Sequence, residues 1–310
     1  MRRVVVLGAG RPLGARVLAA LEALPGVERA IGLESRPGFI PDDGPGIECL
    51  PWSPDHRAFA ERLRKDEIDT VVDCALVEAR TGARARTPGA DVIAAMCVGA
   101  AVAHDDSPVR GWVVVSSTDY YPASSYRPLL HREEERVGDF ATGPAETIAE
   151  AEEYVRAIAE RKPHVEVAIL RLQAIVGAGF RGALAELFSR DRIPVCPGFD
   201  PAVQMLHPDD AVAAIVWAAE VGLTGVFNVA SSGLLRLGEA VRRAGGRRAV
   251  ALPFAPPVGR AALRALGLAP VAGELYDLLR HGNAVDAGKL ARAGFEARRT
   301  QVDCLAARDA

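Results

Sequence analysis

The sequence predicts an α/β protein whose core is a doubly wound parallel sheet, followed by a smaller C-terminal lobe. Short runs rich in valine and isoleucine alternate with segments of helical spacing, which is the order of strand-helix-strand units. The apolar runs lack alternating polar residues, as expected for strands buried on both faces. The first run passes directly into a glycine-rich turn and then into a helix, as at the start of a Rossmann-type fold.

The predicted elements divide the chain into two parts. Strands are expected over residues 4–7, 30–33, 70–73, 112–116 and 165–170. Helices are expected over residues 13–24, 55–65, 91–104, 146–161, 181–189, 208–221 and 237–243. Glycine and proline become frequent after about residue 172, so we predict a Rossmann-type domain over residues 1–172 and a smaller lobe, partly interleaved with it, over residues 173–310.

Composition excludes several classes of partner. The formal net charge is −3 with both signs interspersed and no basic face, so nucleic acid is not expected to bind. No apolar run reaches the length of a membrane span without glycine, proline or charge, so no membrane partner is expected. The five cysteines are scattered without the spacing of a metal site. An odd number of cysteines without a secretion signal fits a cytoplasmic protein.

The N-terminal glycines are the first candidate binding site. Residues 4–14 read Val-Val-Val-Leu-Gly-Ala-Gly-Arg-Pro-Leu-Gly, which places Gly8, Gly10 and Gly14 between a buried strand and a helix. Glycine permits the tight turn and lets the backbone approach phosphate groups. The start of a helix attracts a pyrophosphate through its N–H groups and dipole. Pro12 suits the first helical turn, where its missing donor has no cost.

Glu34 is the second part of this site. It follows Gly14 by about 20 residues, at the end of the second predicted strand, where a carboxylate binds ribose hydroxyls. A carboxylate there also repels a 2′-phosphate, which favours NAD over NADP, although nearby Arg36 leaves NADP open. The alternative is an ordinary strand-helix turn with a surface glutamate.

At this point the chain resembles the extended short-chain dehydrogenases, the NAD-dependent epimerase/dehydratase group. The matching segments, in order along the chain, are residues 8–14, 32–34, 70–75, 113–121, 169–177, 206–211 and 225–229. The resemblance implies a C-terminal substrate lobe. It also implies cofactor contacts from Gly8, Gly10, Arg11, Pro12, Leu13, Gly14, Glu34, Ala75 and Ser116.

Two departures from the family pattern concern the chemistry. Arg11 stands where the family has glycine, and it either reaches the pyrophosphate or crowds it. The family's Tyr-x-x-x-Lys pair is missing, because Pro144 and Ile148 occupy its positions and no such pair occurs elsewhere in the chain. A phenol, with a pKa near about 10, is a poor base at neutral pH without a neighbouring cation.

Three interpretations of the active site stay open. In the first, a substitute acid or base follows the strand that ends at Ser116: Thr118 and Tyr121 are the leading catalytic candidates, and Asp119, Tyr120, Tyr126 and His131 are the others. In the second, the protein binds NAD(P) without redox chemistry, as a sensor or regulator. In the third, cofactor binding is lost as well and only the fold is kept as a scaffold.

Residues 132–136, with three glutamates, are interpreted as a solvated segment.

The resemblance leads to one functional prediction. We expect an NAD-dependent epimerase, dehydratase or reductase-like enzyme that acts on a hydroxyl or carbonyl compound with a non-standard active site. A nucleotide sugar is one option for the small-molecule substrate, whose identity the sequence does not give. Family members often pair through two long helices, here residues 91–104 and 146–161, so we predict a homodimer.

Overall fold

The computed structural model describes residues 3–34, 48–75, 90–121, 129–136, 144–244, 248–253 and 255–307. The chain forms two compact units. The first unit consists of Met1–Tyr120, Val137–Arg171 and Val212–Phe227, and the second of Tyr121–Arg136, Leu172–Ala211 and Asn228–Ala310. The sequence division at residue 172 differs from these units in two segments. Residues 212–227 belong to the first unit because they complete its sheet, and residues 121–136 belong to the second.

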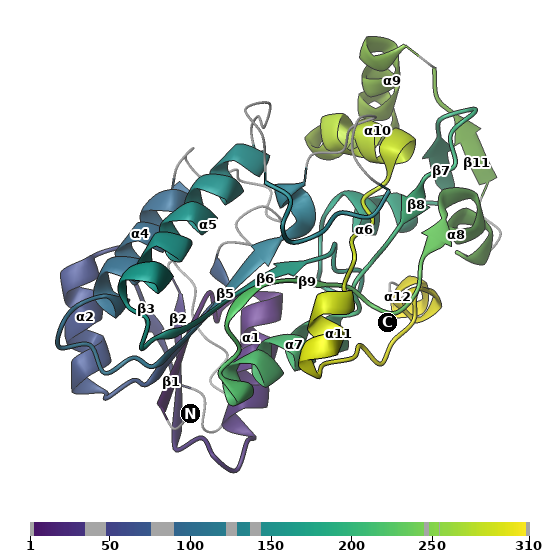
Figure 1. The fold of residues 1–310 in the computed structure, drawn as a ribbon. Coiled ribbons are helices and arrows are strands. Elements are labelled where there is room, and N and C mark those ends of the chain that lie inside the picture. The colour runs from purple at the N-terminus through teal and green to yellow at the C-terminus, as the bar shows by residue number, and fades with distance from the viewer. Residues whose placement is uncertain are drawn as a thin grey trace. The chain divides into compact units, whose positions relative to one another are not determined.

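The first unit is built on a seven-stranded sheet with the order β3-β2-β1-β4-β5-β6-β9 (Figure 1). Its strands are β1 (Arg3–Leu7), β2 (Arg29–Glu34), β3 (Glu48–Pro51), β4 (Thr70–Asp73), β5 (Gly111–Ser117), β6 (Glu166–Leu172) and β9 (Gly225–Val229). Strand β1 pairs in parallel with both β2 and β4, so Leu7 has Leu33 on one side and Asp73 on the other. The strand order therefore reverses between β1 and β4, and the carboxyl ends of these two strands form a topological switch point.

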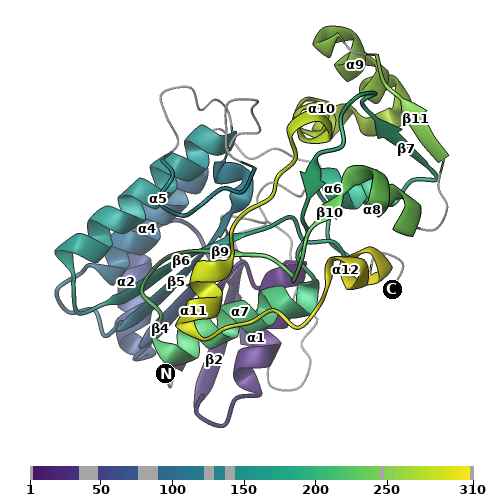
Figure 2. The ribbon, with the colours of Figure 1, turned by 45° about the vertical axis from the view of Figure 1, so that its right-hand side comes forward.

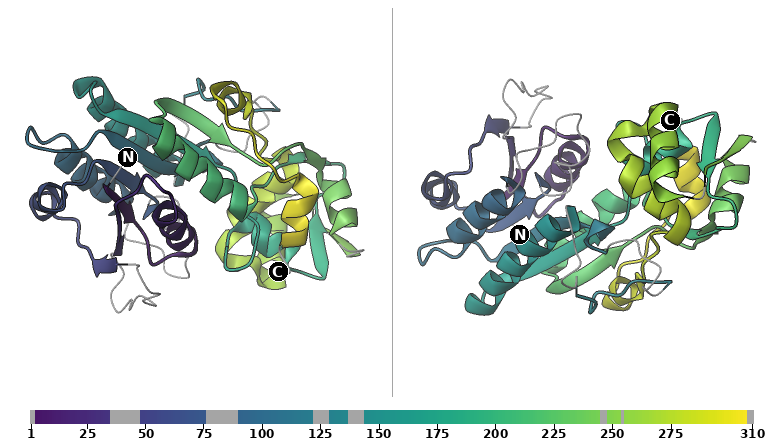
Figure 3. Two further views of the ribbon diagram at one scale, coloured as in Figure 1. Left: turned by 90° about the horizontal axis from the view of Figure 1, so that it is seen from below. Right: turned by 90° about the horizontal axis from the view of Figure 1, so that it is seen from above.

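Helices cover both faces of this sheet. They are α1 (Pro12–Glu22), α2 (His56–Lys65), α4 (Ala90–Val102), α5 (Pro144–Arg161) and α7 (Pro208–Val221). Helices α2, α4 and α5 pack together on one face, and α1 and α7 cover the other (Figures 1 and 2). The layers can also be followed from below and above (Figure 3). The predicted doubly wound α/β fold is confirmed, and each predicted strand of the first unit forms within two residues of its expected ends.

Burial explains why these segments form. Val4, Val5, Val6 and Leu7 are at most 1% exposed, as expected for a strand covered on both faces. Trp112 on β5 is fully buried in the same core. Burying such side chains stabilises the fold by roughly 25 cal/mol for each Å² of apolar surface removed from water. The short strand β3 was not predicted, because its four residues are exposed or half-buried and lack the apolar pattern.

The second unit has its own core and smaller elements. Strand β7 (Arg192–Val195) pairs in parallel with β11 (Arg248–Ala251), and β8 (Ala202–Val203) pairs antiparallel with β10 (Leu235–Arg236). Its further helices are α6 (Ala183–Phe188), α8 (Leu237–Arg243), α9 (Pro256–Leu263), α10 (Ala272–His281), α11 (Gly288–Ala293) and α12 (Gln301–Ala307). Leu184, Phe188, Met205 and Tyr276 are fully buried at its centre.

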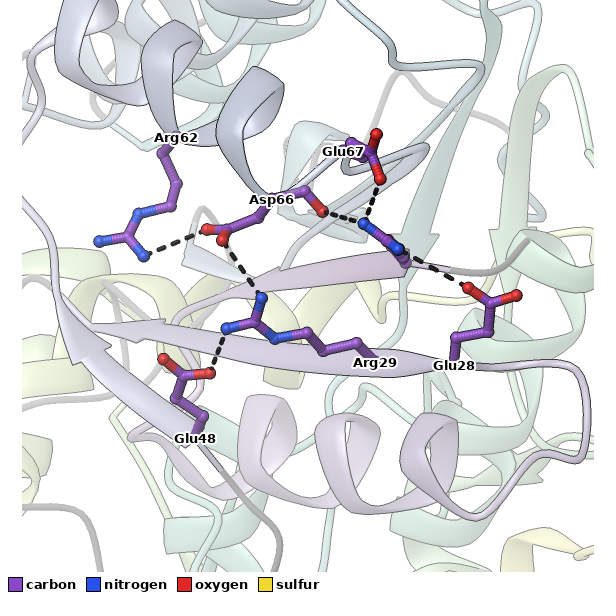
Figure 4. Close-up of polar contacts among 7 residues, drawn as sticks. Glu28, Arg29, Glu48, Arg62, Asp66 and Glu67 are labelled. Carbon is purple, nitrogen blue, oxygen red and sulfur yellow. Dashed lines mark hydrogen bonds and ion pairs between the residues drawn. The ribbon is translucent and has the colours of Figure 1, made fainter.

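A charged cluster lies where β2 and β3 begin (Figure 4). The Arg29 guanidinium contacts Asp66 Oδ1 at 3.2 Å and Glu48 Oε2 at 2.7 Å, and Arg62 contacts Asp66 Oδ2 at 3.1 Å. The Glu48 hydrogen bond raises the pKa of Arg29 above its usual value. The glycine loop follows the opposite, carboxyl end of β1, so this cluster is remote from the predicted binding site.

Among the helices in the described parts of the chain, none is both long and apolar enough to span a membrane.

Candidate functional site

The glycine loop has the backbone geometry that only glycine allows. Gly8 has φ +77°, and a Cβ on Gly14 would lie 2.2 Å from the Gly8 carbonyl oxygen. A Cβ on Gly32 of β2 would lie 2.6 Å from Ala9 Cβ. The N–H groups of Gly8 and Ala9 both donate to the Leu33 carbonyl, at 2.8 and 3.2 Å. The loop is therefore held close to β2 and to the start of α1, as a phosphate-binding turn requires.

The N-cap residue of helix α1 supplies no side-chain hydrogen bond to the first N–H groups of the helix. Arg11 is the N-cap residue and makes no side-chain cap hydrogen bond, Pro12 is the first helical residue, and no acidic residue lies in the first turn. The positive end of the helix dipole is therefore not offset by a carboxylate of its own helix. Pro12 is exposed, whereas Leu13 and Gly14 are buried. This arrangement suits an external anion.

Three residues predicted for the cofactor site meet beside this loop. The Arg11 Nε atom lies 3.7 Å from Glu34 Oε2, and Arg11 Nη1 donates to the Ala75 carbonyl at 3.4 Å. The side chains of Arg11 and Glu34 are only 8% and 2% exposed. Glu34 therefore faces the glycine loop, and the Arg11 side chain spans the carboxyl ends of β2 and β4. Arg36, which left NADP open, lies outside the described residues.

Asp73, which sequence reasoning did not assign to the site, orients Ala75. Its Oδ1 atom accepts a hydrogen bond from the Ala75 N–H at 3.0 Å, and the carboxylate is buried at the end of β4. An aspartate directly after the two valines of β4 was the available signal in the sequence. This contact presents the Ala75 carbonyl to Arg11.

Ser116 belongs to a buried ionic network. Its hydroxyl donates to Glu152 Oε1 at 2.7 Å, and Arg171 Nη2 donates to Glu152 Oε2 at 2.6 Å. Ser116, Glu152 and Arg171 are fully buried, and the Arg171 guanidinium lies 3.4 Å from the centre of the Tyr120 ring. Arg156 adds a further contact to Glu152 at 2.9 Å. The role of Ser116 toward a cofactor stays a prediction, since the contact observed for its hydroxyl is structural.

This network fixes how helix α5 lies on strand β5. Glu152 is held to Ser116, so Ile148 lies one helical turn earlier and Pro144 two turns earlier. Ile148 is 2% exposed and packs in the interior. The position on α5 where the family's Tyr-x-x-x-Lys pair has its lysine is thus occupied by a buried apolar side chain. Thr118, which begins the short 3-10 turn Thr118–Tyr120, is buried.

In the second unit, Tyr121 and His131 are brought together. Their rings stack with centroids 4.9 Å apart and an interplanar angle of 8°. The Tyr121 hydroxyl donates to Asn228 Oδ1 at 2.9 Å, and His131 Nδ1 lies 2.8 Å from Glu135 Oε2. These contacts join two of the predicted acid/base candidates in one polar cluster. Tyr126 lies outside the described residues.

The interpretation of residues 132–136 as solvated is wrong for Glu133. Its side chain is 8% exposed and accepts a hydrogen bond from the Asn228 N–H at 2.9 Å. Asn228 also donates to the carbonyls of His131 and Asp286, both at 3.2 Å. Asn228 is the organising residue of the cluster, and the partners it bonds are distant in sequence, which is why sequence reasoning missed it.

Metal-dependent chemistry and cysteine-based nucleophilic chemistry find little support in the parts of the chain that the structure describes. No group of three His, Cys, Asp or Glu side chains there is placed to hold a metal ion. All five cysteines are free of disulfide bonds. Burial raises the pKa of both Cys97 and Cys304 to about 11, so these thiols stay protonated at neutral pH and are weak nucleophiles.

Comparison with known proteins decides the family. The model of the NAD dependent epimerase/dehydratase family matches residues 4–230. The chain belongs to this family. An uncharacterised Mycobacterium tuberculosis protein is 32% identical over 251 residues, which cover 78% of this chain and 65% of that relative. The predicted family resemblance is thus confirmed, and the chain spans less than two thirds of the length of this relative.

Solved structures of similar fold cover nearly the whole chain. A putative epimerase from Burkholderia cenocepacia has a TM-score of 0.73 at 21% identity, covering 100% of this chain and 99% of that chain. The dTDP-glucose 4,6-dehydratase of Bacillus anthracis, solved with NAD, has a TM-score of 0.70 at 12% identity, covering 99% and 95%. At these identities the likeness concerns the fold.

Proposed function

We propose that the chain binds NAD and transfers a hydride between the nicotinamide and a carbon that bears oxygen, as an epimerase, dehydratase or reductase. The observation that carries this proposal is the backbone geometry of the glycine loop, in which Gly8 and Gly14 admit no side chain. The loop and the start of α1 would hold the diphosphate. Glu34, at the end of β2, would accept hydrogen bonds from ribose hydroxyls.

The substrate class follows from the chemistry of hydride transfer. A secondary alcohol or its ketone is required, and a nucleotide sugar is the first class to test, because a dTDP-glucose dehydratase and UDP-glucuronic acid epimerases share the fold. Tyr121 would transfer the proton, and Thr118 would hydrogen-bond the substrate oxygen. His131 is an alternative base, since a hydrogen bond from Nδ1 to Glu135 would orient the ring and leave Nε2 as the acceptor nitrogen.

A second candidate function is nucleotide binding without turnover. The observation in its favour is Ile148, which is buried where the family lysine would lower the pKa of a tyrosine. The Tyr121 hydroxyl also donates its hydrogen bond to Asn228 Oδ1. In this alternative the chain is an NAD-dependent sensor, regulator or scaffold.

Titration with NADH is the experiment that tests the proposal. We expect saturable binding, measured by nicotinamide fluorescence, with slow reduction of simple ketones by NADH and slow oxidation of nucleotide sugars when NAD⁺ is supplied instead. Binding without turnover of any of these compounds would favour the sensor. If neither NADH nor NADPH binds at millimolar concentration, the proposed function is wrong.

We also propose that the chain forms a homodimer through α4 and α5. Two apolar side chains three residues apart on α4, Ile93 and Met96, are 57% and 45% exposed, and α4 packs on α5. An apolar helix face of this kind favours burial against a second copy.

A cytoplasmic location is proposed as well, because all five cysteines are free of disulfides.

The dimer has a direct test. Light scattering should give the mass of two chains for the native protein and of one chain for the double variant Ile93→Glu, Met96→Glu. Leu234→Glu is the matched control, because Leu234 is an exposed apolar residue of the second unit, 42% exposed. A native protein that is monomeric at micromolar concentration would contradict the proposal.

A further inference from the structure

We propose that the Arg11 side chain is a latch on the candidate nucleotide site, because its guanidinium lies on the Glu34 carboxylate and must leave it before a nucleotide binds there. The inference rests on the proposed nucleotide binding and deepens it, since it concerns how the site opens. The sequence leaves two roles open for Arg11, reaching the pyrophosphate or crowding it. The structure shows the guanidinium turned to Glu34, with Arg11 Nε 3.7 Å from Glu34 Oε2.

The Glu34 carboxylate is almost completely covered in the structure. Its side chain is 2% exposed, and the side chain of Arg11 is 8% exposed. A nucleotide hydroxyl that bonds this carboxylate must approach to about 2.5–3.0 Å, the length of an ordinary O–H···O hydrogen bond. The guanidinium lies at Oε2 of the same carboxylate. A nucleotide and the Arg11 side chain therefore compete for Glu34.

The side chain of Arg11 is the part of the pair that can move, because the backbone of both residues is held. The Arg11 N–H donates to the Gly8 carbonyl at 3.1 Å, and the Arg11 carbonyl accepts from the Ala15 N–H at 2.8 Å. The Glu34 carbonyl accepts from the Trp52 N–H at 2.9 Å. Rotation about the side-chain bonds of Arg11 can thus uncover Glu34 while the glycine loop and the end of β2 stay in place.

Charge explains why the pair forms and how a nucleotide replaces it. The guanidinium and the carboxylate attract each other at a buried position, where water screens the attraction poorly. The guanidinium lies 3.7 Å from Glu34 and 3.4 Å from the Ala75 carbonyl, whereas an ordinary N–H···O bond measures about 2.7–3.2 Å. These long contacts are weak enough to exchange. A diphosphate at the start of α1, where Arg11 is the N-cap residue, would offer the guanidinium a second anion.

A latch changes affinity in the direction opposite to that of a binding residue. If the pair is formed in about nine molecules of ten, the apparent dissociation constant is about tenfold higher than it is without the pair. Removing the guanidinium should therefore tighten nucleotide binding. Removing an arginine that only holds the diphosphate, or that only stabilises the loop, would weaken binding instead. The sign of the change separates the latch from both of these roles.

Calorimetric titration with ADP-ribose measures this change without any turnover. We expect Arg11→Ala to bind ADP-ribose about threefold to tenfold more tightly than the native protein does. In the Glu34→Gln background the same substitution should give no tightening, because a neutral amide no longer attracts the guanidinium. Arg11→Met keeps an extended side chain without its charge and should tighten binding in the same way, which covers the case of an Arg11→Ala protein that does not fold.

Arg29→Ala is the matched control for the loss of an arginine from an ion pair. Arg29 begins β2, whereas Glu34 ends it, and the Arg29 guanidinium pairs with Glu48 and Asp66 (Figure 4). This variant should bind ADP-ribose as the native protein does.

The outcomes distinguish the latch from the proposed function. Unchanged or weaker binding of ADP-ribose by Arg11→Ala and Arg11→Met would overturn the inference alone, and so would equal tightening in the native and Glu34→Gln backgrounds. Binding by Arg11→Ala where the native protein binds too weakly to measure would support a latch that is formed in nearly every molecule. Failure of the native protein and of both Arg11 variants to bind ADP-ribose would overturn the inference together with the proposed function.

Discussion

Replacing Glu152 by glutamine is expected to lower the free energy of unfolding by about 3–5 kcal/mol, the usual cost of removing one partner from a buried ion pair. Glu152 and Arg171 are both fully buried, and the carboxylate accepts hydrogen bonds from Arg171 at 2.6 and 3.0 Å and from Ser116 at 2.7 Å. The variant leaves the Arg171 guanidinium in the interior without its carboxylate. Urea denaturation should show a lower midpoint with an unchanged slope.

Glu153→Gln is the matched control for this prediction. Glu153 is the neighbouring residue on α5, its side chain is 70% exposed, and it lies 3.9 Å from Arg156. Such a surface pair contributes at most about 1 kcal/mol. The double variant Glu152→Met, Arg171→Met should recover part of the stability lost in Glu152→Gln, since it removes both buried charges. Equal stabilities of the two single variants would show that the buried pair does not stabilise the first unit.

The fold of the first unit could be predicted because the signals for its strands and helices lie within short stretches of the sequence. Strands such as Arg3–Leu7 contain short apolar runs, and helices such as Pro208–Val221 begin and end at residues with clear preferences. The second unit was harder, since α9 to α12 are short helices whose packing depends on distant partners. Helix α12, for example, buries Cys304 and Leu305, yet its seven residues show no long periodic pattern.

The sequence predicts the residues of the candidate site, but not the contacts that these residues make with one another. Glycines and an acid at the right spacing indicated Gly8, Gly14 and Glu34, whose positions follow from the strand-turn-helix unit. The ion pair of Arg11 with Glu34 was not predicted, because side-chain direction is set by the tertiary structure. Asn228 escaped notice for the same reason, since its hydroxyl partner Tyr121 is 107 residues away in sequence.

The missing lysine has a structural consequence beyond catalysis. With Ile148 buried, the interior beside β5 gains an apolar side chain where the family mechanism needs a cation. Arg171, a buried cation of β6, is already paired with Glu152 and stacked on Tyr120. A proton donor on the segment after β5 must therefore obtain its pKa from other groups, and the His131–Glu135 pair is the arrangement in the described second unit that resembles an oriented base.

Gly14→Ala is expected to weaken NADH binding by at least about tenfold, equivalent to about 1.4 kcal/mol. A Cβ at this position would lie 2.2 Å from the Gly8 carbonyl oxygen and 2.7 Å from its carbon, and both are backbone atoms that cannot rotate away. The first turn of α1 must then move off the loop, which separates the helix N-terminus from the turn that would face the diphosphate. Overpacking of this kind also costs about 1–3 kcal/mol of stability.

Gly111→Ala shows whether that loss is specific to the loop. Gly111 begins β5 in the same unit, and its added Cβ would meet Thr70 at an ordinary contact distance of 3.6 Å. This control should bind NADH as the native protein does, and its melting temperature should not fall. Because NADH titration and thermal melting measure different quantities, a Gly14→Ala protein that stays folded while losing affinity locates the diphosphate at the loop. A folded Gly14→Ala protein with native affinity would instead place the nucleotide elsewhere, and Gly8 and Gly14 would then be explained by helix packing alone.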